Sequence, residues 1–351
     1  MGHAIDHLLL PLLRSLTALE FMARYLDPMV IDAVMERIGH VDEPLRAARA
    51  DVSLDADDED AAHLVAASDA ALAAFDGVRA AFRDGDDLYA LFRALRFLPR
   101  AQEALYPLAH RLAPVNSFFV APALRDDAEA LAIRAVPPRP GETGVMHVGN
   151  EPGSRGGFSL YVPETYAPDR SWPLVIALHG GSGNGRGFLW SWLRDARSSG
   201  AILVAPTAIA RTWALAGEDA DTPNLNRIFD HVAERWRIDP SRILLTGMSD
   251  GGTFCYVNGL EPGSRVTHLA PACATFHPML AAMAEPARLD GLPIFLVHGA
   301  RDWMFPVEVA RRAREALSQA GADVTYREFA DLSHCYPREV NSELLGWLSA
   351  S

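Results

Sequence analysis

Six short apolar or alternating runs, separated by segments of helical length, constrain the fold of the C-terminal part of the chain. One such segment, TPNLNRIFDHVAERWRI, has Asp221 or Thr222 as its expected cap. Strands that alternate with helices predict an α/β fold, with a mostly parallel sheet covered on both faces. In such a sheet the reactive groups lie at the carboxyl ends of the strands. The runs are FSLYVP (158–163), PLVIALHG (173–180), AILVAP (201–206), RILLTG (242–247), PIFLVHG (293–299) and DVTYREF (323–329).

The N-terminal part of the chain has a different pattern. Apolar residues recur there at three- and four-residue spacing, as in DLYALFRALRFL, which predicts an all-helical domain of five or six helices over residues 1–136. The segment AVPPRPGETG is rich in Pro and Gly, so residues 137–144 are expected to be a linker. The α/β domain then covers residues 145–351.

Composition excludes several classes of partner. The net charge is −13 and all 32 basic residues are Arg, so the acidic balance argues against nucleic-acid binding. The three cysteines show no paired spacing, which favours a reducing compartment. The N-terminus lacks the basic region of a signal peptide, and no apolar run reaches the roughly 18 residues of a membrane span. We therefore expect a soluble, cytoplasmic protein.

No metal site is expected. The acidic run DADDED (55–60) could begin a calcium loop, but that loop needs Gly at its sixth position and Glu at its twelfth. Here those positions hold Asp60 and Ala66, so a solvated loop before a helix is the better interpretation.

The most specific local signal is GMSDGG (247–252), directly after the run RILLTG. A strand, a tight turn and a helix place the central Ser249 in a strained, exposed position, and the glycines relieve crowding around it. A glycine-rich turn with an incidental serine is the alternative. The pattern favours a nucleophile at Ser249.

An acid and a base follow in the order that a serine hydrolase of this fold requires. Asp302, in HGARDWMFP, and His334, in DLSHCYP, each follow a different predicted strand. The carboxylate would orient the imidazole, which would take the serine proton. Four other histidines fit the base less well, because they precede the acid in the chain or belong to a strand or another motif: His179, His268, His277 and His298.

The segment HGGSGNGRGF (179–188) predicts an oxyanion site. Backbone N–H groups of a glycine-rich loop can closely approach a tetrahedral oxyanion. We expect the N–H groups of Gly181 and Asp250 to be the donors, with Ser182 as an alternative.

The sequence indicates the residues of the substrate pocket less clearly than it indicates the catalytic residues. Trp213 and Trp303 lie in loops expected near the strand ends and are candidate substrate contacts, ahead of Trp190, Trp192, Phe276 and Met304. The segment from Ala270 to Leu292 is too short for a large helical cap. We therefore expect the N-terminal domain either to cover the active site or to form the subunit contact of a homo-oligomer.

With these residues laid out, residues 145–351 resemble the serine esterases of the α/β-hydrolase superfamily. They look closest to the polyhydroxybutyrate-depolymerase-like and phospholipase/carboxylesterase-like esterases, through HGGSGN, IDPSRILLTGMSDGG, HGARDWMFP and DLSHCYP. The resemblance implies a catalytic triad of Ser249, Asp302 and His334, with oxyanion donors at Gly181 and Asp250. It implies no metal or organic cofactor. Residues 1–140 resemble no such family.

The expected activity is hydrolysis of small to medium, fairly apolar carboxylic esters through an acyl-enzyme. A peptidase of the same fold is an alternative, since the triad does not distinguish an ester from an amide. A non-catalytic binding or scaffolding protein on the same fold is a second alternative.

Overall fold

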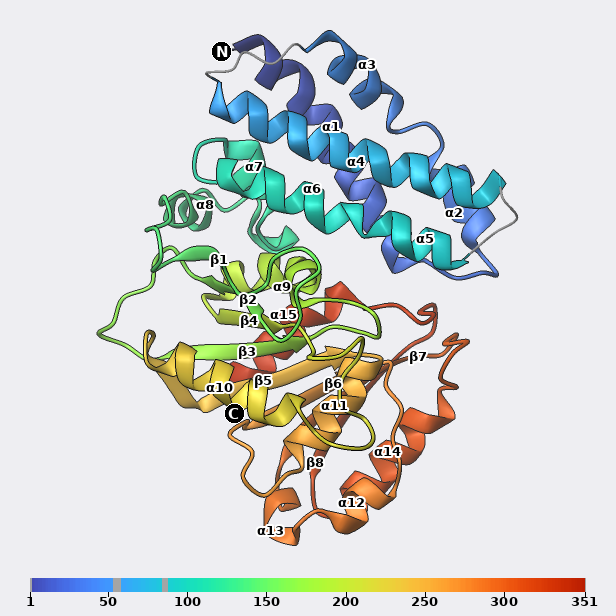
Figure 1. The fold of residues 1–351 in the computed structure, drawn as a ribbon, viewed down its shortest axis with the longest axis vertical. Coiled ribbons are helices and arrows are strands. Elements are labelled where there is room, and N and C mark those ends of the chain that lie inside the picture. The colour runs from blue at the N-terminus through green and yellow to red at the C-terminus, as the bar shows by residue number, and fades with distance from the viewer. Residues whose placement is uncertain (1, 53–57, 84–87, 351) are drawn as a thin grey trace. The chain divides into compact units, whose positions relative to one another are not determined.

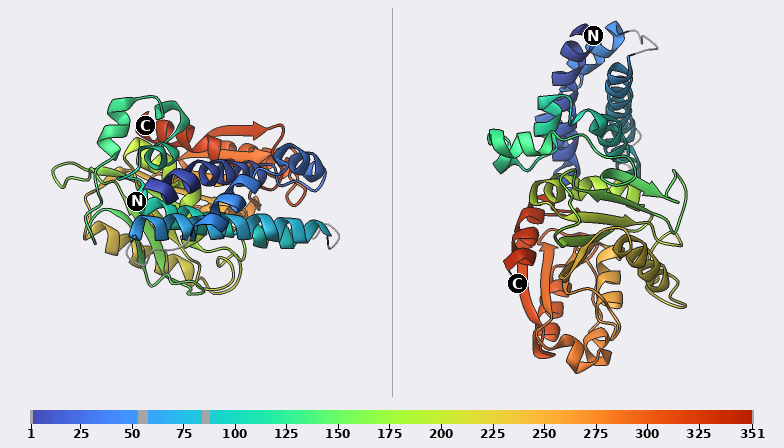
Figure 2. Two further views of the ribbon diagram at one scale, coloured as in Figure 1. Left: turned by 90° about the horizontal axis from the view of Figure 1, so that it is seen from above. Right: turned by 90° about the vertical axis from the view of Figure 1, so that its left-hand side faces the viewer.

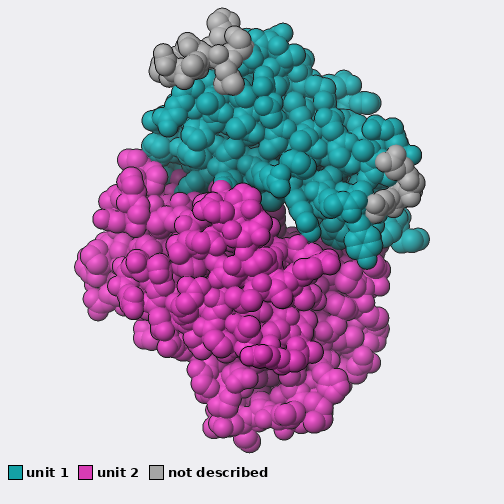
Figure 3. All heavy atoms as spheres, viewed as in Figure 1, with its two compact units in different colours: residues 1–136 teal, residues 137–351 magenta. Residues whose placement is uncertain are grey.

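Two compact units, residues 1–136 and residues 137–351, make up the computed structural model (Figure 3). The structure describes residues 2–52, 58–83 and 88–350. Asp55 to Asp57 of the acidic run lie outside the described residues.

The first unit is all-helical, as predicted. Its described residues form eight α-helices and two 3₁₀ turns (Figure 1). This number exceeds the expected five or six because some apolar stretches form two helices instead of one. Pro99, for example, lacks the N–H that would bond to Leu95, so α5 and α6 separate at Arg96. The helices are α1 (Gly2–Arg24), α2 (Ile31–Ile38), α3 (Glu43–Asp51), α4 (Glu59–Arg83), α5 (Leu88–Leu95), α6 (Phe97–Leu105), η1 (Tyr106–Leu108), α7 (Ala113–Phe118), η2 (Pro122–Leu124) and α8 (Ala128–Arg134).

Helix α4 forms the centre of the first unit and packs against α1, α5 and α6. By length and composition it is the one described helix that could cross a membrane, but 56% of its apolar window is buried inside the protein. Leu64, Ala71 and Val78 lie on its buried face at seven-residue spacing. This is the burial pattern of a core helix.

An eight-stranded sheet in the order β1-β2-β4-β3-β5-β6-β7-β8 organises the second unit. Strand β2 is antiparallel to both of its neighbours, and the other pairs from β4 to β8 are parallel. The predicted α/β fold class is therefore confirmed. The strands are β1 (Gly144–Val148), β2 (Phe158–Val162), β3 (Trp172–Leu178), β4 (Ile202–Pro206), β5 (Ile238–Met248), β6 (His268–Ala272), β7 (Pro293–Gly299) and β8 (Asp323–Phe329).

Two strands were absent from the six predicted runs. Strand β6 has the sequence HLAPA, in which Pro271 removes a ladder donor, yet it pairs between β5 and β7 and is buried throughout. Strand β1 begins at Gly144, where the sequence predicted a linker to end. That segment folds against the second unit: the Trp236 Nε1–H donates to Glu142 O at 2.8 Å, and Thr143 is buried.

Helices cover both faces of this sheet. Helices α9 and α15 pack against each other, and α15 and α10 lie on opposite sides of the strands (Figure 2, right). Only the short α12 and α13 lie between β6 and β7, so this position has no large cap. The helices are α9 (Gly185–Ser199), α10 (Asp221–Ala233), α11 (Asp250–Gly259), α12 (Met279–Met283), α13 (Pro286–Leu289), α14 (Glu308–Gln319), η3 (Arg338–Val340) and α15 (Asn341–Ala350).

Candidate active site

Ser249 occupies a sharp turn between β5 and α11. Its backbone has φ 55° and ψ −120°, a left-handed region that a serine rarely adopts. Glycines permit the turn: a Cβ on Gly247 would lie 2.5 Å from Gly251 C, and one on Gly251 would lie 2.5 Å from His179 O. The predicted strand–turn–helix around Ser249 is therefore present.

Strained backbone conformations cluster at the carboxyl ends of the strands. The three non-glycine residues with positive φ in the described chain are Ser182, Ser249 and Cys273, which follow β3, β5 and β6. Such strain persists where the surrounding structure holds it, and it clusters at functional sites. It marks the carboxyl ends of the strands as the candidate site.

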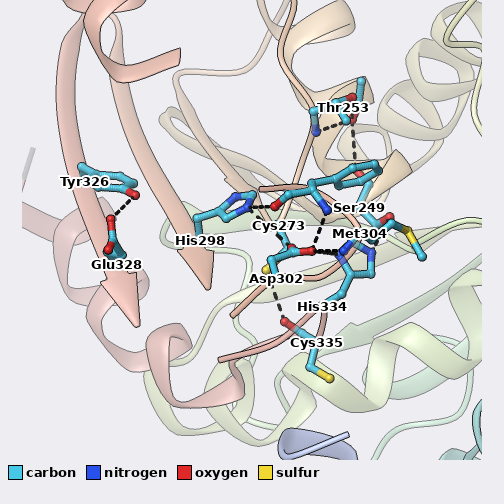
Figure 4. Close-up of polar contacts among 12 residues, drawn as sticks. Ser249, Thr253, Cys273, His298, Asp302, Met304, Tyr326, Glu328, His334 and Cys335 are labelled. Atoms are coloured by element: carbon cyan, nitrogen blue, oxygen red, sulfur yellow. Dashed lines mark hydrogen bonds and ion pairs between the residues drawn. The ribbon is translucent and has the colours of Figure 1, made fainter. Parts of the chain in front are cut away.

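Ser249, His334 and Asp302 form one hydrogen-bonded row (Figure 4). His334 Nδ1 lies 2.9 and 3.0 Å from the two Asp302 oxygens, and His334 Nε2 lies 3.0 Å from Ser249 Oγ. Because a carboxylate only accepts, Nδ1 carries the proton, and Nε2 is left to accept from the serine hydroxyl. All three side chains are buried, with exposed fractions between 4% and 7%.

The Asp302 carboxylate is fixed by its own loop. Its Oδ1 accepts the backbone N–H groups of Met304 at 3.0 Å and Phe305 at 2.8 Å. The buried His298, at the end of β7, donates from Nε2 to Phe305 O at 2.8 Å, and the same nitrogen lies 3.5 Å from Asp302 Oδ2. His298 therefore holds the loop that carries Asp302.

The HGG loop lies against the serine turn. A Cβ on Gly180 would be 3.6 Å from Ser249 Cβ, and one on Gly181 would be 2.6 Å from Asp250 Oδ2. Among the described residues, neither the Gly181 N–H nor the Asp250 N–H donates a hydrogen bond. Ser182, the alternative donor, already donates its N–H to Arg211 O. Two backbone donors thus remain available beside Ser249.

His179 supports this loop from behind. Its Nδ1–H donates to Gly180 O at 2.7 Å, and its Nε2 accepts from Ala208 N at 3.1 Å. Burial lowers the pKa of His179 to about 4, so the ring is neutral near pH 7. The sequence expectation of a structural role for His179 fits these contacts.

Trp213 is not placed as a substrate contact, which corrects the expectation from sequence. It is 2% exposed, its ring stacks on Phe254 at 5.4 Å, and its Nε1–H donates to His179 O at 2.7 Å. Since its one polar atom and its ring are already engaged, Trp213 buttresses the HGG loop. Trp190 and Trp192 are likewise buried.

Trp303 has the exposure expected of a pocket residue. It is 44% exposed, and its ring centroid lies 6.3 Å from that of His334. Phe305 meets the same imidazole edge-on at 5.1 Å, and Met304 is 39% exposed. Apolar side chains therefore flank His334.

The loop around Thr212, which the sequence did not single out, contacts the serine turn. The Thr212 hydroxyl donates to Asp250 Oδ2. The loop is held by Asp221, whose carboxylate accepts from Ile209 N and Ala214 N at 2.8 Å. Asp219 instead accepts from the first N–H groups of α10, so neither Asp221 nor Thr222 is the cap expected. The carboxylate of Asp221, nine residues after Thr212, was the only available sequence signal.

No group of three or more metal-ligating side chains occurs among the described residues. What the site contains is a serine hydroxyl beside an imidazole, a carboxylate bonded to that imidazole, and two backbone N–H groups. These are the parts of acyl-transfer chemistry.

Comparisons with known proteins fit this arrangement. A family model described as Phospholipase/Carboxylesterase matches residues 216–349, a stretch that contains Ser249, Asp302 and His334 but begins after the HGG loop. The bifunctional acetylxylan esterase/xylanase XynS20E of Neocallimastix patriciarum is 31% identical over 157 residues, which cover 43% of this chain and 22% of that protein. The chain thus spans less than a quarter of this relative.

Solved structures of esterases are also similar. A ferulic acid esterase has 15% identity and a TM-score of 0.49, covering 59% of this chain and 96% of that one. A thermostable esterase has 21% identity and a TM-score of 0.47, covering 59% of this chain and 62% of that one. The order of the sheet with its antiparallel second strand, together with the family match over residues 216–349, supports an α/β-hydrolase fold for residues 137–351.

Proposed function

We propose that the second unit is a carboxylic-ester hydrolase that works through an acyl-enzyme on Ser249. The single observation that carries this proposal is the row from Ser249 Oγ to His334 Nε2, 3.0 Å, and from His334 Nδ1 to Asp302, 2.9 Å. The family match to phospholipases and carboxylesterases supports it, as does the esterase activity named for XynS20E.

The geometry accounts for each step. His334 Nε2 takes the hydroxyl proton as Ser249 Oγ attacks the ester carbonyl, and Asp302 stabilises the imidazolium that forms. The N–H groups of Gly181 and Asp250 hold the oxyanion. His334 then gives its proton to the departing alcohol, and water releases the acid by the same route.

The substrate class follows from the surroundings of His334. Trp303 and Met304 are partly exposed next to the base, and Phe305 contacts its ring. These side chains favour small to medium, fairly apolar esters over charged ones.

The test compares wild type with Ser249→Ala on p-nitrophenyl acetate, butyrate and octanoate. We expect kcat to fall at least about a thousandfold, because the nucleophile is lost. Ser241→Ala is the matched control: Ser241 lies on the same strand, exposed and bonded to Asp239, and its loss should change kcat less than about twofold.

Three outcomes would contradict the proposal. Unchanged activity in Ser249→Ala would remove Ser249 as the nucleophile. Faster turnover of a matched p-nitroanilide than of the ester would indicate a peptidase, while a wild type inactive on both would favour a binding protein on this fold.

A further inference from the structure

A cavity of about 590 Å³, open to solvent, lies at the surface of the first unit, between α1, the C-terminal end of α2 and α7. This volume is in the range of pockets that hold small organic ligands, about 300–1,000 Å³. The residues of α1 that line the cavity recur at four-residue spacing, so they lie on one face of the helix. This face forms much of the wall. The lining residues are Leu13, Arg14, Thr17, Ala18, Phe21, Arg37, Ile38, Val41, Pro114, Ser117, Phe118 and Arg125.

The charge of this cavity is one-sided. Three arginines line it and no acidic residue does, although the unit is rich in Asp and Glu. Among the described residues, Arg14 and Arg37 make no hydrogen bond or ion pair. The positive charges of Arg14 and Arg37 are therefore not neutralised by a carboxylate among the described residues.

Other arginines of the same unit behave differently. Arg49 bonds to Asp69 through two nitrogens, Arg111 pairs with Asp60, and Arg46 and Arg79 both pair with the buried Asp42. Each of these four arginines thus pairs with a carboxylate, which Arg14 and Arg37 do not.

Apart from Thr17 and Ser117, the remaining wall is apolar and aromatic. The Arg37 guanidinium lies over the Phe21 ring, 4.5 Å from its centroid. A stacked guanidinium keeps its in-plane N–H groups available for an anion, and its fork matches the two oxygens of a carboxylate. Leu13, Ile38 and Phe118 offer contact to a hydrocarbon chain.

We propose that this cavity binds an amphiphilic carboxylate, with its head on Arg14 and Arg37 and its apolar chain along the aliphatic and aromatic wall. The recognition is by charge complementarity at one part of the cavity and by burial of apolar surface at the other. The proposal is independent of ester hydrolysis, since none of its residues belongs to the second unit.

The test is calorimetric titration of the full chain with octanoate. We expect Arg14→Gln/Arg37→Gln to weaken octanoate binding at least tenfold, because the charge-assisted bonds to the head are lost. Arg100→Gln is the matched control: Arg100 is exposed and stacked on Phe97, outside the cavity, and its loss should leave the affinity unchanged. Octanol and acetate, which lack the charge or the chain, should bind wild type at least tenfold more weakly.

A second pair of variants tests the location without altering charge. Ala18→Phe would fill the cavity and should abolish octanoate binding, whereas Ala18→Ser should preserve it. Because the readout is binding, Ser249→Ala should titrate as wild type does, whatever its hydrolytic activity.

Equal octanoate affinity in wild type and Arg14→Gln/Arg37→Gln would overturn the proposal, as would equal weakening in Arg100→Gln. A change of oligomeric state in the double variant, with no effect on octanoate, would identify a subunit contact and overturn it as well.

Discussion

The triad of the second unit and the cavity of the first unit differ in how their polar and charged side chains are paired. In the second unit, Ser249, His334 and Asp302 are bonded to one another, and His298 secures the loop of the acid. In the first unit, Arg14 and Arg37 line a cavity without a polar partner among the described residues. Internal pairing preorganises groups for chemistry, whereas unpaired charge leaves binding energy for an external ligand.

The largest expected effect comes from the base. His334→Gln should lower kcat/KM for p-nitrophenyl butyrate at least about a thousandfold, because no group then takes the Ser249 proton. The matched control is His268→Gln, a buried histidine of the same unit that packs on Trp347 away from the triad. It should change kcat/KM less than about threefold. Equal losses of kcat/KM in both variants would mean that each substitution damages the fold. The pairing of His334 with Ser249 and Asp302 would then have no specific role in catalysis.

The next effect concerns stability and pH. Burial lowers the pKa of His179 to about 4, whereas in the unfolded chain it stays near 6.5. Between these values the unfolded chain binds a proton that the folded chain does not. The contribution of neutral His179 is therefore complete above pH 6.5 and is lost as the pH falls towards 4.

Urea unfolding of the second unit measures this contribution. From pH 7 to pH 4, wild type should lose up to about 3 kcal/mol more of its free energy of unfolding than His179→Asn does. Parallel pH dependences in the two proteins would show that the HGG loop does not depend on a neutral His179.

The smallest effect tests whether His298 positions the acid. His298→Phe removes the donor to Phe305 O and should lower kcat about tenfold while KM stays within about twofold. His298→Gln keeps an N–H near the same place and should recover most of kcat. If Gln and Phe reduce kcat equally, the bond to Phe305 O is not what matters.

Much of the second unit could be predicted because its signals are local. The buried strands are apolar runs, and the glycines around Ser249 are readable as a tight turn. The order of Ser249, Asp302 and His334 predicts that they meet, since the carboxyl ends of parallel strands share one edge. Strand β6 escaped prediction because Pro271 is atypical of a central strand, and only pairing with β5 and β7 makes it one.

Which aromatic residues are exposed at the site, and which residues line the cavity, could not be predicted, because both depend on tertiary contacts. Trp213 and Trp303 look alike in sequence, yet one buttresses the HGG loop and the other is exposed beside His334. The cavity of the first unit joins residues from α1, α2 and α7, so no local pattern announces it. Sequence gives the spacing along each helix, but helix packing decides which faces meet.

The most direct test of the central claim is covalent labelling of the full chain with a p-nitrophenyl phosphonate, followed by peptide mass mapping. The account predicts one phosphonyl adduct, on Ser249, absent from Ser249→Ala and formed far more slowly in His334→Gln. An adduct on another serine, such as Ser182, or labelling that persists in Ser249→Ala, would contradict it.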